Sequence, residues 1–110
     1  MIDEIIGAVG ICKKGSKYLM LKHKDGYWSF PGGKVEPEDL NIKDGLIREI
    51  NEELSLKPDS YNLTETPVIN RFIYGKEKPQ RIGKRGITYY FLMDLKKRYR
   101  ASTICRNSRS

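Results

Sequence analysis

The sequence lacks long hydrophobic runs, and their absence excludes a large class of proteins. No apolar stretch approaches the roughly 20 residues that a membrane-spanning helix needs. The first ten residues are acidic and carry no basic group before their apolar part, which argues against a secretory signal peptide. We therefore expect no membrane partner.

Cysteine and histidine are scarce, which limits the metal and disulfide chemistry that the chain can support. The 110 residues contain two cysteines, Cys12 and Cys105, whose separation does not match a zinc-binding spacing. They do not make the disulfide framework of a small secreted domain, so a reducing, cytoplasmic location fits best. The one histidine, His23, ends an expected strand, and we interpret it as structural or exposed.

Acidic residues are fewer than basic residues, and most of the excess positive charge lies at the C-terminal end of the chain. The net charge is +7. Residues 96–110 hold six basic and no acidic residues, which leaves a net charge of +1 for the preceding part. We expect residues 1–95 to form the domain and residues 96–110 to form a basic, flexible tail. Nucleic-acid binding through this tail is one functional hypothesis, and it predicts a steeply salt-dependent affinity.

Apolar segments separated by turn residues predict one mixed α/β domain. A helix is expected from about Leu40 to Leu54, where apolar side chains recur on one arc. Asp39 or Asn41 can cap its first turn. A polar, basic segment precedes the last strand, at residues 76–86. The expected strands cover residues 5–14, 17–23, 67–75 and 87–95.

Three glutamates share one face of the expected helix. Glu49, Glu52 and Glu53 are spaced i, i+3, i+4, within an arc of about 100°. Like charges at this spacing weaken an isolated helix, so their presence beside a core face indicates a bound cation. Oxygen ligands favour Mg²⁺ or Mn²⁺ over zinc or copper. Arg48, four residues before Glu52, can hydrogen-bond a carboxylate and orient it. A solvated, charged helix surface is the alternative.

A Pro-Gly-Gly turn precedes this helix and strengthens the metal interpretation. Pro31-Gly32-Gly33 allows the backbone to approach a ligand closely and leaves carbonyl oxygens available to a metal. An ordinary tight turn would explain these residues alone, but the turn and the acidic helix together favour a ligand site. Further carboxylates follow within six residues of the turn, namely Glu36, Glu38 and Asp39.

Residues 28–56 resemble the Nudix box. That pattern is Gly, five residues, Glu, seven residues, Arg-Glu, an aliphatic residue, any residue, Glu-Glu, any residue, Gly and an aliphatic residue. Gly33 matches the opening glycine, and the block from Arg48 to Glu53 matches without a mismatch. The resemblance extends more loosely over residues 5 to 95. It implies a Nudix-type α/β/α sandwich around a mixed β-sheet.

The chain departs from the Nudix pattern at two places. Gly33 and Arg48 are 15 positions apart, where the pattern has 14. Either Glu38 or Asp39 therefore takes the place of the first box glutamate. Ser55 replaces the later glycine, which ends the helix in a left-handed conformation that serine tolerates less well.

The resemblance implies metal-dependent hydrolysis of a phosphoanhydride bond in a nucleoside diphosphate linked to another group. Depending on the linked group, the substrate would be a dinucleoside polyphosphate, an NTP or dNTP, or a 5′-triphosphate RNA. With Mg²⁺ or Mn²⁺ as cofactor, Glu52, Glu53 and the Gly33 carbonyl would be metal ligands. Glu49 would be a ligand or the general base, and Arg48 would hold a carboxylate in place. Arg48, Glu49 and Glu52 are thus the expected catalytic residues.

Substrate-binding residues lie outside the box and are predicted from charge and ring chemistry. Basic side chains near the last two strands suit a polyphosphate, and an aromatic ring suits a base. A solvated basic loop is the alternative for each basic residue, and one of Tyr89 and Tyr90 is expected in the core. The candidates are Arg71, Lys84, Arg85 and Tyr27.

The C-terminal part departs most from the family. Nudix proteins close their fold with a further helix, whereas residues 96–110 have no helical period, so we expect this helix to be missing. The chain is then either a shortened product or a natural version that forms a homodimer over the uncovered face. A catalytically weak or inactive nucleotide-binding module is the alternative to an active hydrolase.

Overall fold

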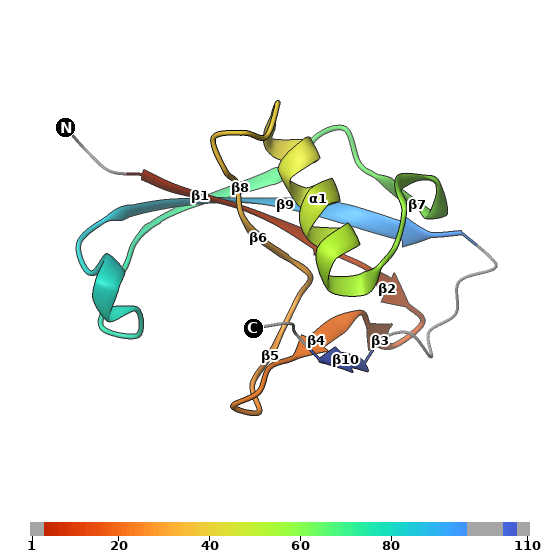
Figure 1. Ribbon diagram of the computed structural model, residues 1–110, viewed down its shortest axis with the longest axis horizontal. Helices are drawn as coiled ribbons and strands as arrows, with labels where there is room; N and C mark the ends of the chain where they lie inside the picture. Colours follow the sequence, from red (N-terminus) through yellow and green to blue (C-terminus); the bar gives the residue numbers. More distant parts are fainter. Residues whose placement is uncertain (1–3, 97–104, 108–110) are drawn as a thin grey trace.

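The chain forms a mixed β-sheet with one helix packed against one face (Figure 1). The computed structural model describes residues 4–96 and 105–107. In chain order the elements are β1 (Glu4–Ile11), β2 (Lys13–Lys14), β3 (Lys17–Tyr18), β4 (Met20–Lys22), β5 (Trp28–Ser29), β6 (Gly32–Lys34), α1 (Ile42–Leu54), η1 (Pro58–Ser60), β7 (Tyr61–Leu63), β8 (Val68–Ile73), η2 (Pro79–Arg81), β9 (Arg85–Leu95) and β10 (Cys105–Asn107).

The main sheet is built around β1 and β9, which run parallel to each other. Its order is β6-β1-β9-β7, and β8 also pairs with β9. β6 runs antiparallel to β1 and places Gly33 opposite Ala8. Since paired residues share a face, Gly33 and Ala8 both face α1. Parallel and antiparallel pairs in one sheet confirm the mixed α/β fold that the sequence predicts.

Helix α1 covers the core side of this sheet. Asn41 caps its start, because the Asn41 side chain accepts a 2.8 Å hydrogen bond from the backbone N–H of Asp44. Ser55 is the C-cap of α1 and adopts the left-handed conformation, with φ 57°. The apolar arc is buried, with Leu46 and Ile50 fully inaccessible to solvent. This arc packs against the sheet in one hydrophobic cluster that includes Ala8, Phe91 and Met93.

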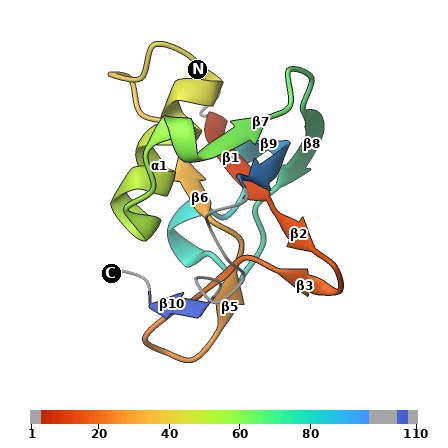
Figure 2. The same cartoon turned by 90° about the vertical axis from the view of Figure 1, so that its right-hand side faces the viewer.

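A smaller sheet, β10-β4-β5, lies below the main sheet in both views (Figures 1 and 2). β10 runs parallel to β4 and lies within the expected tail, so part of that segment forms a strand that the sequence did not predict. Residues 97–104 and 108–110 of the tail lie outside the described residues. Among the residues that the structure describes, α1 is the only α-helix, and no helix is long and apolar enough to cross a membrane.

Candidate active site

Arg48 lies at the centre of the acidic residues on α1. Its Nε donates to Asp39 Oδ1 at 2.9 Å and its Nη2 donates to Asp39 Oδ2 at 3.0 Å. Nη2 also donates to the backbone carbonyl of Lys34 at 3.1 Å. Nη1 lies 3.4 Å from carboxylate oxygens of both Glu49 and Glu52. One guanidinium therefore joins the loop before α1, strand β6 and two helix carboxylates.

Asp39, and not Glu38, is the loop carboxylate that Arg48 holds. The Asp39 side chain is 7% exposed, whereas Glu38 is exposed. Asp39 Oδ2 also accepts a 2.8 Å hydrogen bond from the backbone N–H of Glu36. The hydrogen bonds from Arg48, and then that from Glu36, hold the pKa of Asp39 below its ordinary value. This settles which residue stands in the place of the first box glutamate.

The backbone at Gly33 lies directly against the Glu49 carboxylate. A Cβ atom built on Gly33 would lie 2.6 Å from Glu49 Oε2, so only glycine allows this approach. Burial raises the pKa of Glu49, and the opposing effect of Arg48 is smaller. The turn and the acidic helix, which are separate in the sequence, thus meet at one place.

Glu53 reaches back to the same turn from the end of α1. Its Oε1 accepts a 2.9 Å hydrogen bond from the backbone N–H of Gly32. Within residues 4–96 and 105–107, no three acidic, histidine or cysteine side chains converge closely enough to hold one ion in this arrangement. The donor chemistry nevertheless fits a hard divalent cation, because the Glu49 and Glu53 carboxylates beside the Gly32–Gly33 backbone offer oxygen ligands alone.

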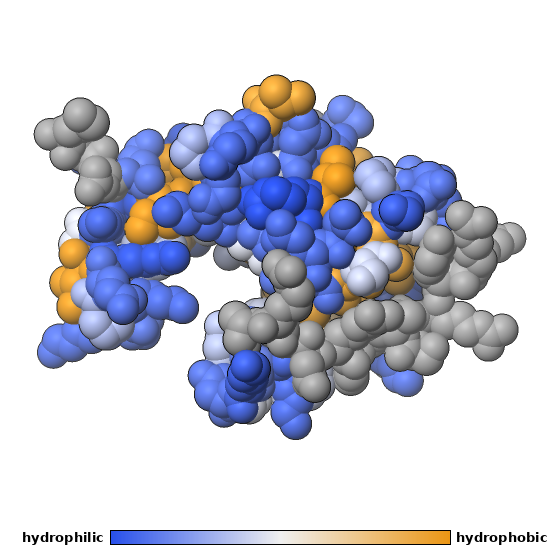
Figure 3. Space-filling view, in the orientation of Figure 1, coloured by the Kyte–Doolittle hydropathy of each residue, from blue (hydrophilic) through white to orange (hydrophobic). Residues whose placement is uncertain are grey.

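A cleft of about 260 Å³ begins at Gly33. It lies on the side of β1 opposite to Ala8, since the β1 residues that line it alternate with those that pack under α1. A hollow is visible in Figure 3 between the turn around η2 and the part that contains β4 and β5. The lining residues are Ile5, Gly7, Val9, Gly33, Lys34, Tyr74, Arg81 and Thr88.

Two residues of the η2 hairpin supply the polar wall of this cleft. The Arg81 guanidinium lies 5.3 Å from the centre of the Tyr74 ring, and its Nη1 lies 3.2 Å from the Tyr74 hydroxyl. The hairpin closes where the backbone N–H of Tyr74 donates to the carbonyl of Lys84 at 3.0 Å. Tyr74 was missed by the sequence analysis, and Arg81 was not separated there from the other basic residues of its segment.

Comparison with known proteins identifies the family. The profile of the NUDIX domain matches residues 2–103. The chain belongs to this family. YtkD of Bacillus subtilis (strain 168) is 40% identical over 50 residues, covering 46% of this chain and 31% of YtkD. The U8 snoRNA-decapping enzyme of Xenopus laevis is 32% identical over 78 residues, covering 71% of this chain and 34% of that enzyme.

The fold is also that of solved Nudix structures. The E. coli dihydroneopterin triphosphate pyrophosphohydrolase aligns with a TM-score of 0.67 and 18% identity. The alignment covers 82% of this chain and 67% of the E. coli chain. The matched part of this Nudix domain spans about one third of the length of the two relatives above.

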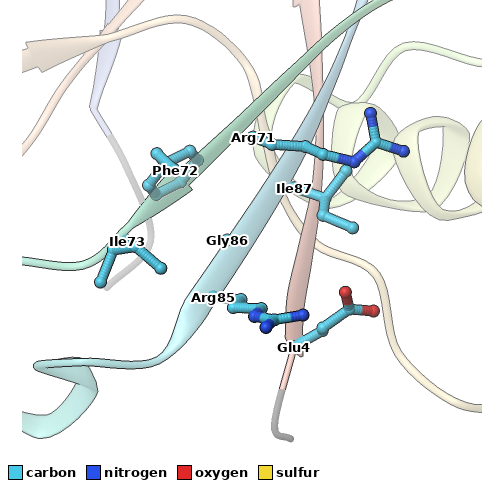
Figure 4. Close-up of a pocket in the computed structure, with 7 residues that line it drawn as sticks. All are labelled: Glu4, Arg71, Phe72, Ile73, Arg85, Gly86 and Ile87. Carbon is cyan, nitrogen blue, oxygen red and sulfur yellow. The ribbon is translucent and has the colours of Figure 1, made fainter.

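The predicted substrate-binding residues lie outside the cleft of this Nudix domain. Arg71 and Arg85 line a different cavity, of about 340 Å³, together with Glu4, Phe72, Ile73, Gly86 and Ile87 (Figure 4). The Tyr27 ring stacks on His23 with a centroid distance of 4.2 Å, in the turn between β4 and β5. The Lys84 carbonyl closes the η2 hairpin. These four substrate-binding assignments stay predictions, and Tyr74 and Arg81 are added to them as further candidates.

Proposed function

We propose that this Nudix domain hydrolyses a phosphoanhydride bond in a nucleoside diphosphate linked to another group, with Mg²⁺ or Mn²⁺ as cofactor. The observation that carries the proposal is the position of Gly33, which meets the Glu49 carboxylate on the α1 side of the sheet and also lines the cleft on the other side. The cleft is lined by the Arg81 cation as well. A phosphate chain bound in the cleft would run from this cation toward Gly33 and the carboxylates beyond it.

The residues that would hold the metal are Glu49, Glu52, Glu53 and the Gly33 carbonyl. When bound, the cation neutralises charge on the phosphate oxygens and lowers the pKa of a coordinated water. Arg48 positions Glu49 and Glu52, since its Nη1 lies beside both. Glu49 is half-buried against Gly33, and a carboxylate there can accept a proton from an attacking water.

The phosphate-binding part of the proposal has two sets of candidates. Lys34 and Arg81 line the cleft that begins at Gly33, and a guanidinium can bind a phosphate through two hydrogen bonds. Arg71 and Arg85 belong to the neighbouring cavity and would contact a longer substrate. The substrate classes we propose are dinucleoside polyphosphates, NTPs or dNTPs, and 5′-triphosphate RNA. Two relatives support this range, because YtkD is a putative 8-oxo-dGTP diphosphatase and the Xenopus protein is a U8 snoRNA-decapping enzyme.

A second candidate function is a nucleotide-binding module with weak or no turnover. The observation in its favour is that Arg48 Nη1 lies 3.4 Å from both Glu49 and Glu52, and that three ligating side chains do not converge within the described residues. Such a domain would bind a nucleotide in the cleft and release it unchanged, and equilibrium dialysis would measure that binding. An active enzyme would release a cleaved product.

The deciding experiment is incubation of the protein with magnesium and a substrate panel, with products identified by mass. The panel contains dinucleoside tetraphosphate, ADP-ribose, normal and oxidised dNTPs, and a 5′-triphosphate RNA. Glu52→Gln removes one carboxylate charge at the site, and Glu38→Gln is the matched control on an exposed glutamate. We expect magnesium-dependent cleavage that Glu52→Gln abolishes and Glu38→Gln leaves intact. If the folded protein cleaves no substrate of the panel with either magnesium or manganese, the hydrolase proposal is wrong.

A further inference from the structure

Three aromatic residues lie on and next to the β4–β5 hairpin, at the end of β3, in β5 and just after β5, and none of them lines the cleft. Tyr18 is 41% exposed and Trp28 is 44% exposed. Phe30 meets Tyr18 edge-on at a centroid distance of 5.9 Å and directly follows β5, in which Ser29 pairs with buried Leu21 and Trp28 pairs with exposed Lys22. Because side chains alternate along a strand, Trp28 faces away from the buried Leu21 side, and we expect Phe30, two residues on, to do the same. We define Tyr18, Phe30 and Trp28 as the aromatic stripe.

A lysine accompanies each exposed ring of the aromatic stripe. Lys22 is the register partner of Trp28, and its Nζ lies 5.8 Å from the Trp28 ring centre. Lys13 Nζ lies 5.7 Å from the ring centre of Tyr18. Residues 13–30, which contain the stripe, include five lysines and one acidic residue. The stripe is therefore apolar along its rings and positive beside them, although the domain as a whole is nearly neutral.

We propose that the aromatic stripe binds a single-stranded polynucleotide. Every base offers a flat face to an aromatic ring, and the lysines beside the rings suit the phosphates that alternate with the bases. A duplex offers only its phosphates to such a surface, because its bases are already stacked. An acidic protein segment would match the charge of the lysines and leave the exposed rings without a matching partner.

The aromatic stripe is connected to the cleft by a short piece of chain. Phe30 is three residues before Gly33, which lines the cleft, so the two are at most roughly 10 Å apart along the backbone. A single-stranded polynucleotide bound to the aromatic stripe can therefore extend toward the cleft. The binding itself requires no hydrolysis, so this inference goes beyond the proposed function and does not depend on it.

The composition of the chain provides a direct probe of this binding. Trp28 is the only tryptophan, so its fluorescence reports on the stripe itself. The protein is titrated, in buffer with EDTA, with oligo(U) and oligo(dT) of about 12 nucleotides. A base-paired duplex and inorganic polyphosphate serve as separate probes. We expect strong quenching by both single strands, and weak quenching by the duplex and by polyphosphate. The oligo(U) and oligo(dT) arms distinguish a general single-strand site from one that requires the ribose hydroxyl.

Variants are compared by the anisotropy of a labelled oligo(U). Trp28→Ala with Tyr18→Ala should weaken binding at least about tenfold, whereas Trp28→Phe with Tyr18→Phe should retain it. Lys13→Ala and Lys22→Ala should each reduce the slope of log affinity against log salt concentration by about 0.7. Lys57→Ala, at an exposed lysine near β7, is the control and should leave this slope unchanged. Circular dichroism verifies the fold of each variant.

Three results would overturn the proposal. The first is unchanged Trp28 fluorescence while the labelled strand binds, which would place binding on another part of the chain such as the basic tail. The second is equal affinity for polyphosphate and oligo(U), which would reduce the interaction to charge alone. The third is full affinity in the double alanine variant of Tyr18 and Trp28, since the rings would then contribute nothing.

Discussion

Asp39 and Arg48 are joined by two parallel hydrogen bonds of 2.9 and 3.0 Å, which tie the loop to the second turn of the helix through one ion pair. Asp39 is six residues after Gly33, the same interval as in the Nudix pattern. The extra residue of this chain therefore lies between Asp39 and Arg48. The insertion leaves the acidic partner of the arginine in place and lengthens only the approach to α1.

Loss of the Asp39 carboxylate should impair catalysis by releasing Arg48. Asp39→Ala removes the partner of two donors, so the guanidinium is no longer oriented toward Glu49 and Glu52. We expect a loss of kcat/KM of roughly 10- to 100-fold, together with a lower Tm. Glu38→Ala is the matched control, because this neighbouring glutamate is exposed. Equal losses in the two variants would contradict the pairing seen here.

A methyl group at Gly33 should separate the turn from the helix carboxylate. The new Cβ would lie 2.6 Å from Glu49 Oε2, so Gly33→Ala must displace Glu49. A shift of this kind at the proposed catalytic carboxylate should lower kcat by roughly 100-fold while the fold is retained. Gly10→Ala, on the adjacent strand and outside the cleft lining, meets its nearest atom, Met93 Sδ, at 3.4 Å and should keep most of the activity. Steady-state kinetics on both variants checks the prediction, which fails if Gly33→Ala is as active as Gly10→Ala.

Arg81 should act on substrate binding more than on the chemical step. It lines the cleft beside Gly33 and is held by Tyr74, so Arg81→Ala removes a cation from the proposed phosphate path. We expect KM to rise roughly tenfold with kcat little changed. Arg71→Ala and Arg85→Ala, from the neighbouring cavity, are the comparison. A larger KM effect at Arg71 or Arg85 would favour the assignment made from sequence.

Tyr61 carries a buried hydroxyl with no hydrogen-bond partner among the described residues. Because an unpaired buried polar group is destabilising, Tyr61→Phe should raise the free energy of unfolding by about 1 kcal/mol at pH 7. Tyr74→Phe, whose hydroxyl lies 3.2 Å from Arg81 Nη1, should show no such gain. Urea denaturation of the two variants measures the difference, and a destabilised Tyr61→Phe would show that the hydroxyl has a partner.

Tyr61 should also make the protein sensitive to alkali. Burial raises the pKa of Tyr61 from 10.0 to about 12 in the folded state, so the unfolded chain loses this proton first. Ionisation of Tyr61 therefore leaves the free energy of unfolding unchanged below pH 10 and lowers it as the pH rises from 10 toward 12. The stability gap between Tyr61→Phe and the parent should therefore widen from pH 9 to pH 11. A constant gap over this range would contradict the shift.

The helix and the longer strands were predicted from their local patterns, whereas the short elements that depend on distant pairing were not. Helix α1 was expected from about Leu40 to Leu54 and spans Ile42–Leu54, because its apolar period and its Asn41 cap are local properties. β10 was missed, since a strand of three residues takes its conformation from pairing with β4. The contact of Tyr74 with Arg81 was missed for the same reason: it exists only once the η2 hairpin closes.

The sequence by itself determined the mixed α/β fold, the acidic face of α1 and the glycine turn before it. These follow from helical periodicity and from the backbone freedom of glycine, which are properties of short segments. Only the tertiary structure decided between Glu38 and Asp39, because adjacent carboxylates in a loop have the same local chemistry and differ only in reach toward Arg48. It also placed Gly33 against Glu49, which depends on how α1 packs on the sheet, and formed the cleft on the opposite face, which depends on how the η2 hairpin lies beside β1 and β6.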